Sequence, residues 1–383
     1  MVRAIVNGVI ITEKEELRGK ALLFDEKIIG IADENEVIAD QKTDAHGMYV
    51  CPGLVDVHIH GYWGEDVSDG SEEGVRKMAK GLLENGVTSF LPTTMTVSWN
   101  EILQALDTVH KLKPISRRED FEGSEILGVH AEGPFINPKR KGAQAEECIL
   151  APDASKVLPH KDLLKIITIA PEMPGGIDFI REVTSQSDIV VSIGHTDASF
   201  ETAMEAIAAG ASHITHLFNA MTGLNHRSPG VVGAALSTDV ACELIADTFH
   251  IHKGLFSFLH HAKKDKLVLI SDCTRAGGLE DGEYTLGGQP IFVKGIECRL
   301  KDGTIAGSVL RLNKAVKNLR DHGGVSMVEA VKAASLNAAA SIGEESTKGS
   351  LAVGKSADIV IMDQECTVDK TFVRGVLKYN KGE

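Results

Sequence analysis

The chain alternates short apolar runs with helix-like segments, and this alternation limits the fold more than any other feature. The runs are rich in β-branched residues, and amphipathic segments with a closing glycine, such as SEEGVRKMAKGLLENG, separate most of them. Near-continuous apolar strands joined by helices are typical of a parallel sheet that is covered on both faces. The runs span residues 54–60, 87–93, 125–133, 165–172, 189–196, 212–219, 242–250 and 266–272.

Eight such strands are the number that a closed (β/α)8 TIM-like barrel requires, and chemically active side chains lie at the carboxyl end of nearly every run. An open doubly wound sheet is the alternative fold. Such a sheet normally has a glycine-rich phosphate turn after its first strand, and no turn of that kind follows residue 60. The sequence therefore predicts an α/β protein with a catalytic barrel over residues 54–346.

The two ends of the chain have a different pattern. Residues 1–53 and 347–383 contain short strand-like runs with turn signals and no helical periodicity. We expect these remote segments to pair into one small β-sandwich domain.

Size and charge narrow the class of protein. A chain of 383 residues, 43% of them hydrophobic, can bury a large core. A net charge of -14 argues against nucleic acid as a partner, because binding to the phosphate backbone needs clustered lysine and arginine. The sequence has neither a secretory signal pattern nor an apolar stretch of membrane-spanning length, so we expect a cytoplasmic protein with no membrane partner and with reduced cysteines.

Two histidines at the end of the first run are the first sign of a metal site. Residues two apart in a strand point to the same face, so His58 and His60 project together. Taken alone, such a pair is as often packed in a core as bound to a metal. Glu132, His195 and His216 lie at the ends of the third, fifth and sixth runs, however, and a barrel would bring them to the same end. One carboxylate and four imidazoles suit a divalent first-row metal.

Asp272 ends the eighth run, and we expect it to face these ligands across the mouth of the barrel. A carboxylate there can bind a metal weakly and accept a proton from water. The alternative role for Asp272 is a helix N-cap. We expect His213 to be structural, since it faces away from His216 in its strand, and His130 to have a packing or supporting role.

Several motifs together resemble one enzyme family. PGLVDVHIHG, HAEGPF, IGHT, THLFNAM, ADTFH and ISD resemble the amidohydrolase superfamily and, within it, the N-acetylglucosamine-6-phosphate deacetylases. The resemblance covers essentially the whole chain. It implies hydrolysis of the acetamide of N-acetyl-D-glucosamine 6-phosphate to D-glucosamine 6-phosphate and acetate, in amino-sugar catabolism.

The resemblance also implies a role for individual residues of the metal centre. Glu132, His195 and His216 match the principal metal ligands of the family, and the pair at residues 58 and 60 matches the ligands of a second ion. Asp272 matches the catalytic acid and base. The cofactor is then one or two divalent ions per subunit, with zinc or iron expected before manganese or cobalt.

The family's contacts to sugar and phosphate match a further set of residues. These are Ala143, Asn219, Ala220, His226, Arg227, His250, Ile305, Ala306 and Gly307. Family members are commonly homodimers, so His226 and Arg227 would reach the phosphate that the neighbouring subunit binds. Gln144 departs from the family pattern, because some members have a sugar-contacting histidine at this position, and its role stays open.

Other functions stay open as well. One alternative within the same class of enzyme is an amidohydrolase whose substrate is another N-acetyl amino-sugar phosphate, such as the galactosamine epimer, or a cyclic amide. From a different class comes a catalytically silent barrel that serves as a scaffold. A silent barrel predicts broken ligand sets, whereas the set in this sequence is complete.

Overall fold

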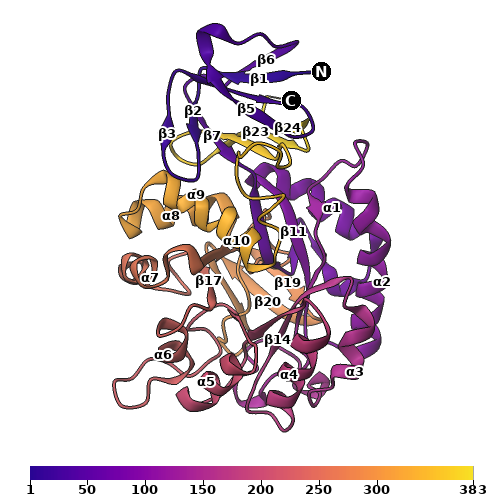
Figure 1. Cartoon of the computed structure of the whole chain (residues 1–383). Helices are drawn as coiled ribbons and strands as arrows, with labels where there is room; N and C mark the ends of the chain where they lie inside the picture. Colours follow the sequence, from indigo (N-terminus) through magenta and orange to yellow (C-terminus); the bar gives the residue numbers. More distant parts are fainter. Residues whose placement is uncertain (383) are drawn as a thin grey trace.

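The centre of the molecule is a curved parallel sheet, seen in the computed structural model, which describes residues 1–382 (Figure 1). Eight of its strands form the barrel: β8 (Leu54–Ile59), β11 (Val87–Thr94), β13 (Val129–Glu132), β14 (Leu164–Ile169), β15 (Val190–Ile193), β16 (His213–Ile214), β17 (Ala241–Ile245) and β18 (Leu267–Ile270). The short strand β12 (Glu125–Ile126) pairs with the start of β11. The sheet closes after β18, where Cys273 pairs in parallel with Ile59 and the amide of Asp272 donates to the carbonyl of His58 over 2.9 Å. The predicted TIM-like barrel is confirmed.

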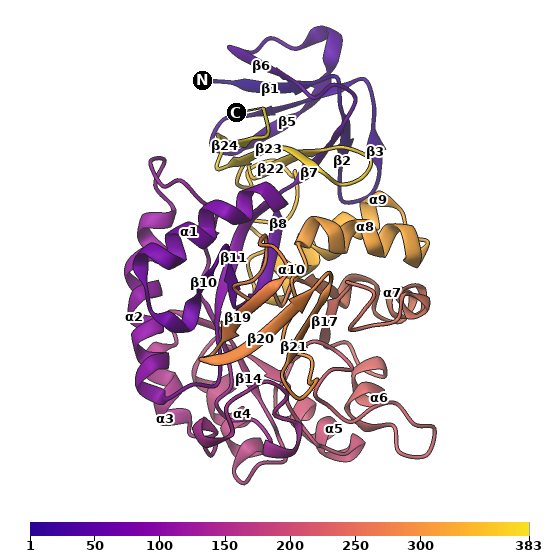
Figure 2. The ribbon, with the colours of Figure 1, turned by 180° about the vertical axis from the view of Figure 1, so that it is seen from behind.

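Helices surround the barrel, as Figures 1 and 2 show. They are α1 (Glu72–Leu82), α2 (Trp99–Ser116), α3 (Ala154–Val157), α4 (Gly176–Gln186), α5 (Phe200–Ala208), α6 (Gly230–Leu236), α7 (Phe256–Lys263), α8 (Leu312–Gly323), α9 (Met327–Ala333) and α10 (Leu336–Ser341). In α1, Ser71 caps the first turn, and Val75, Met78 and Leu82 are buried on one face. Burial of each such side chain contributes about 1.5–3 kcal/mol. No helix within residues 1–382 has both the length and the apolar character needed to cross a membrane.

The ends of the chain form the small β-sandwich domain that the sequence predicts, and both termini lie in it (Figure 1). One sheet has the order β5 (Ile28–Asp33), β4 (Lys20–Phe24), β1 (Arg3–Val6) and β6 (Gln41–Asp44). The other has the order β24 (Val376–Asn380), β23 (Val368–Val373), β22 (Ile359–Met362), β7 (Tyr49–Pro52), β2 (Val9–Ile11) and β3 (Glu16–Leu17). Strand β22 therefore joins the two ends of the chain by pairing antiparallel with β7.

Strand β22 also faces two cores. Ile359 and Ile361 pack inside the small domain, whereas Val360 and Met362 belong to the apolar cluster of the barrel. This follows from the period of two in a strand, which points successive side chains to opposite faces. The six-stranded sheet is therefore the layer between the two domains.

A buried ion network joins the domains at the amino-terminal end of the barrel. Lys348 Nζ lies 2.7 Å from Glu125 Oε2 of β12 and 2.7 Å from Asp358 Oδ2, which precedes β22. The side chain of Lys348 is only 4% exposed. Burial opposes its charge, but the carboxylates of Asp358 and Glu125 outweigh burial and raise the pKa of Lys348.

A three-stranded antiparallel sheet between β18 and α8 was not predicted. It comprises β19 (Gly282–Leu286), β20 (Gln289–Lys294) and β21 (Glu297–Leu300), and Figure 2 shows it beside the barrel strands. Its sequence signal is the pair Gly287 and Gly288, both with positive φ, which form the two-residue turn of a β-hairpin. The side chain of Gln289 donates to the carbonyl of Ala143 over 2.7 Å, so this sheet braces a loop of the site described next.

Candidate metal centre and active site

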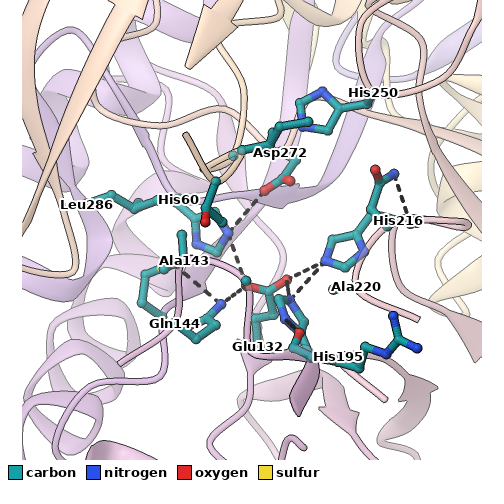
Figure 3. A pocket seen from close by; sticks show the side chains of 17 residues that line it. His60, Glu132, Ala143, Gln144, His195, His216, Ala220, His250, Asp272 and Leu286 are labelled. Atoms are coloured by element: carbon teal, nitrogen blue, oxygen red, sulfur yellow. Dashed lines mark hydrogen bonds and ion pairs between the residues drawn. The ribbon is translucent and has the colours of Figure 1, made fainter. Parts of the chain in front are cut away.

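A cavity of about 330 Å³ opens at the carboxyl ends of the barrel strands. Its volume falls in the range of small-molecule sites, about 300–1,000 Å³. Glu132, His60, His195, His216 and Asp272 line it, and Figure 3 shows the first four of these side chains converging. The position is the one where (β/α)8 barrels build active sites.

The carboxylate of Glu132 is the centre of the cluster. Its Oε1 lies 3.1 Å from Nε2 of His195, 3.1 Å from Nε2 of His216 and 3.3 Å from Nε2 of His58. The Nε2 atoms of His195 and His216 are only 3.0 Å apart. Glu132, His195 and His216 form the first of two donor sets at the cavity that can hold an ion. A third group of donors, His58, His130 and Glu243, shares His58 with the second set and lies outside the cavity lining.

The second donor set is His58, His60 and Asp272. The two imidazole Nε2 atoms lie 3.3 Å apart, and Asp272 Oδ1 is 3.2 Å from that of His60 and 3.5 Å from that of His58. Glu132 Oε2 lies 3.4 Å from His60 Nε2 and its Oε1 lies 3.3 Å from His58 Nε2, so Glu132 bridges the two sets. The spacing of two in the sequence thus does bring His58 and His60 together.

The charge balance of these sets fits a divalent cation. Burial disfavours charge on His60, but Asp272 and Glu132 outweigh it and raise its pKa to about 9. Burial likewise opposes ionisation of Asp272, yet the imidazoles of His58 and His60 prevail and lower its pKa. The buried carboxylates therefore draw positive charge into the cluster, and imidazole nitrogens 3.0 and 3.3 Å apart repel one another when protonated. A cation between them supplies that charge without the repulsion.

The outer nitrogens of His195 and His60 are already engaged, whereas Nδ1 of His216 is buried without a partner. His195 Nδ1 lies 3.2 Å from the carbonyl oxygen of Arg140 and 3.1 Å from that of Lys141, and His60 Nδ1 lies 3.2 Å from the carbonyl oxygen of Thr93. Carbonyl oxygens only accept, so each Nδ1 carries a proton and Nε2 is the nitrogen left to bind a cation in the cavity. This is the usual support of histidine metal ligands.

The backbone is strained where the ligands leave their strands. His195, His216 and Asp272 have φ of 27°, 26° and 49°, in the left-handed region. Such a conformation costs on the order of 1–3 kcal/mol per residue and clusters at functional sites. It turns each side chain from the end of its strand into the cavity.

One residue of the centre, Glu243, was missed by the sequence reasoning, and the role of another, Gln144, was left open. Glu243 lies on β17, fully buried, with Oε2 2.9 Å from His58 Nδ1. Its signal is a carboxylate inside the apolar run ACELIAD. Gln144 is buried as well: its Oε1 accepts from the amide of Thr96 over 2.6 Å, and its Nε2 donates to Glu132. Gln144 therefore contacts the carboxylate at the centre of the cluster, at a position where some family members have a sugar-contacting histidine.

The predicted substrate contacts divide into two groups. Ala143, Asn219, Ala220, His250, Ile305 and Gly307 line the cavity, whereas Ala306 is fully buried. His250 Nδ1 lies 2.6 Å from Asp247 Oδ2, which fixes its ring. His226 and Arg227 occupy an exposed loop, bonded to each other over 3.0 Å, and they do not line this cavity.

His130 and His213 are inside the barrel. His130 Nε2 is 2.8 Å from Thr168 Oγ1 and its Nδ1 is 3.1 Å from the carbonyl oxygen of Val57. His213 Nε2 is 3.2 Å from Glu243 Oε1. Burial lowers the pKa of His130 to about 3, so its ring is neutral.

A closed (β/α)8 barrel with two adjoining sets of imidazole and carboxylate donors at its mouth defines a class, the metal-dependent hydrolases. The profile of the Amidohydrolase family matches residues 49–378. The chain belongs to this family.

Individual relatives narrow the comparison, and they confirm the predicted resemblance to N-acetylglucosamine-6-phosphate deacetylases. The chain is 40% identical over 379 residues to such an enzyme of Bacillus subtilis, across 97% of this chain and 95% of the relative. The crystal structure of the Pasteurella multocida enzyme superimposes with a TM-score of 0.94 at 31% identity, covering 99% of this chain and 100% of the other. An N-acetylgalactosamine-6-phosphate deacetylase of Escherichia coli O157:H7 is 35% identical across 91% of this chain and 92% of the relative.

Proposed function

We propose that the protein hydrolyses the acetamide of N-acetyl-D-glucosamine 6-phosphate and releases D-glucosamine 6-phosphate and acetate. One observation carries the proposal: the two complete donor sets, Asp272 among them, meet at one cavity of suitable size. The similarity to the Bacillus subtilis enzyme over nearly the whole chain supports the same substrate.

The cofactor is a divalent metal. We place one ion with Glu132, His195 and His216, and a second with His58 and His60, because both sets are intact. Imidazole and carboxylate donors suit zinc or iron, and also manganese or cobalt. A cation at such a site polarises a carbonyl oxygen and makes a neighbouring water molecule more acidic.

Asp272 moves the proton. Its lowered pKa keeps it ionised at neutral pH, ready to accept a proton from water as the water oxygen bonds to the acetyl carbon. The bond from that carbon to the amine nitrogen then breaks, and Asp272 returns the proton to the nitrogen. His250, whose ring is fixed by Asp247, turns its other nitrogen to the substrate.

The phosphate is bound across a dimer in this proposal. The loop of His226 and Arg227 is exposed, so both side chains are accessible to a second subunit. The planar guanidinium of Arg227 matches two phosphate oxygens. We place the reaction in the cytoplasm, since a charged phosphate ester does not cross a bilayer unaided.

The test is acetate release from purified protein of measured metal content. We expect turnover of N-acetyl-D-glucosamine 6-phosphate, and Asp272→Asn should keep substrate binding while turnover falls about 10²- to 10⁴-fold, the usual contribution of a general acid or base. The galactosamine epimer is assayed in parallel, because the Escherichia coli relative acts on that substrate by name. Faster turnover of the epimer would replace the proposed substrate, and no acetate from either would refute the deacetylase.

A further inference from the structure

Glu243 contacts both donor sets through a single atom. Its Oε2 lies 2.9 Å from Nδ1 of His58, which belongs to one set, and 2.9 Å from the backbone nitrogen of His216, which belongs to the other. Its second oxygen, Oε1, lies 3.2 Å from His213 Nε2. The side chain is fully buried on β17 and does not line the substrate cavity. Glu243 can therefore affect the reaction only through its neighbours, and the two that belong to the donor sets are His58 and His216.

We infer that Glu243 is a positioning residue that holds His58 and His216 in their metal-binding orientations at the same time. The inference rests on the proposed metal-dependent function and assigns a role to a residue outside the cavity. An ionised carboxylate only accepts, so both groups must donate to Oε2.

For His58, the contact selects the tautomer. With its proton on Nδ1, the ring presents the Nε2 lone pair, 3.3 Å from Glu132 Oε1 and 3.5 Å from Asp272 Oδ1. Without the acceptor, the proton can move to Nε2, and the ring is then no ligand. A supporting hydrogen bond of this kind is typical of histidine ligands, and its loss typically lowers metal affinity 10- to 100-fold.

For His216, the contact fixes the backbone. The residue has φ of 26°, a left-handed conformation that persists only where its surroundings hold it. Its N–H donates to Glu243 and its side-chain Nε2 lies 3.1 Å from Glu132 Oε1. Loss of the carboxylate therefore frees the turn that aims this imidazole. Because one oxygen serves both histidines, we expect a change at Glu243 to weaken both sets together.

The experiment measures zinc affinity directly. Metal-free wild type, Glu243→Leu and Glu243→Gln are equilibrated with chelator-buffered zinc, and bound zinc is measured by mass spectrometry. The leucine variant lacks the acceptor, and its affinity should fall about 10- to 100-fold. The glutamine variant keeps an uncharged oxygen, so its loss should be smaller but measurable. Its turnover should recover as free zinc is raised, and the circular dichroism spectrum of the metal-free variant at the assay temperature should match that of the metal-free wild type, which separates a loss of zinc affinity from a folding defect.

Glu125→Gln is the matched control. Glu125 is also a buried glutamate of the barrel sheet, 3% exposed, but it bonds to Lys348 and contacts neither donor set. This variant should lose stability and keep the zinc affinity of the wild type. If the leucine variant does not fold, the zinc affinity of the glutamine variant tests the inference. Wild-type affinity in the folded glutamine variant would overturn the inference, whereas a wild type that binds none of zinc, iron, manganese and cobalt would refute the proposed function.

Discussion

Replacing Lys348 with methionine tests the buried ion network that joins the barrel to the small domain. The change removes the ammonium group, while the methionine fills most of the same space, so any loss of stability comes from the charge. Glu125 and Asp358 are then buried without the cation that now lies 2.7 Å from each of them.

The expected loss in the free energy of unfolding depends on the partners that each carboxylate retains after the substitution. Removing one partner of a buried ion pair typically costs 3–5 kcal/mol, because an uncompensated charge stays in the core. Glu125 retains Arg117 at 3.2 Å and Arg374 at 3.9 Å, and Asp358 retains the amide of Arg374 at 2.8 Å. These remaining partners offset part of the loss, so we expect the substitution to lower the free energy of unfolding by about 3 kcal/mol.

Urea unfolding followed by circular dichroism measures this change. The triple variant Glu125→Gln, Lys348→Met, Asp358→Asn should recover much of the loss, since it leaves no unpaired charge. Deacetylase turnover of the folded single variant should match the wild type, because Glu125 begins β12, whereas Glu132, the proposed metal ligand, ends β13 at the opposite end of the barrel. A loss below about 1 kcal/mol would refute the reasoning, since exposed pairs already contribute that much.

The same network predicts a dependence on alkaline pH. The pKa of Lys348 is raised in the folded state above its ordinary value of 10.5, because its two carboxylates outweigh burial. The stabilisation is therefore fully present below pH 10.5 and is lost as the pH rises through the folded-state pKa. Above pH 10.5 the wild type should lose stability more steeply than the methionine variant.

Three further changes address the site. Arg227→Ala should raise the KM for the phosphorylated substrate about 10- to 100-fold, because hydrogen bonds to a charged group are lost. The KM for unphosphorylated N-acetylglucosamine should not change. Equal effects on both substrates in steady-state kinetics would contradict the phosphate role. Dialysis against a strong chelator should abolish turnover and lower the melting temperature, with zinc restoring both; turnover in protein shown to be metal-free would contradict the mechanism. Gln144→Leu should lower zinc affinity about 10- to 100-fold, because the amide that holds Glu132 is lost; unchanged zinc binding at equilibrium would exclude that role.

The barrel and its donor sets could be predicted because both follow from local patterns. Apolar strands alternating with helices specify a parallel sheet, and the carboxyl ends of its strands must meet at one rim. His195, His216 and Asp272 could therefore be grouped although 77 residues separate the first from the last.

The supporting residues could not be predicted, because their contacts depend on three-dimensional distances. Glu243 lies in an apolar run whose pattern is that of an ordinary core strand, and only closure of the barrel brings its carboxylate within 2.9 Å of His58 Nδ1. Gln144 is in a loop whose path to Glu132 has no local signal. The left-handed backbone of His195 is set by its surroundings rather than by residue type.

The pairing of β7 with β22 has a consequence for how the protein is made. Residues 49–52 leave the ribosome early, but the strand that covers one of their edges lies at residues 359–362, beyond the entire barrel. During translation the nascent chain must therefore carry an unpaired edge for about 300 residues of synthesis, a state prone to aggregation. Completion of the small domain is then a late event, and chaperones that shield exposed edges should matter most before the final strands emerge.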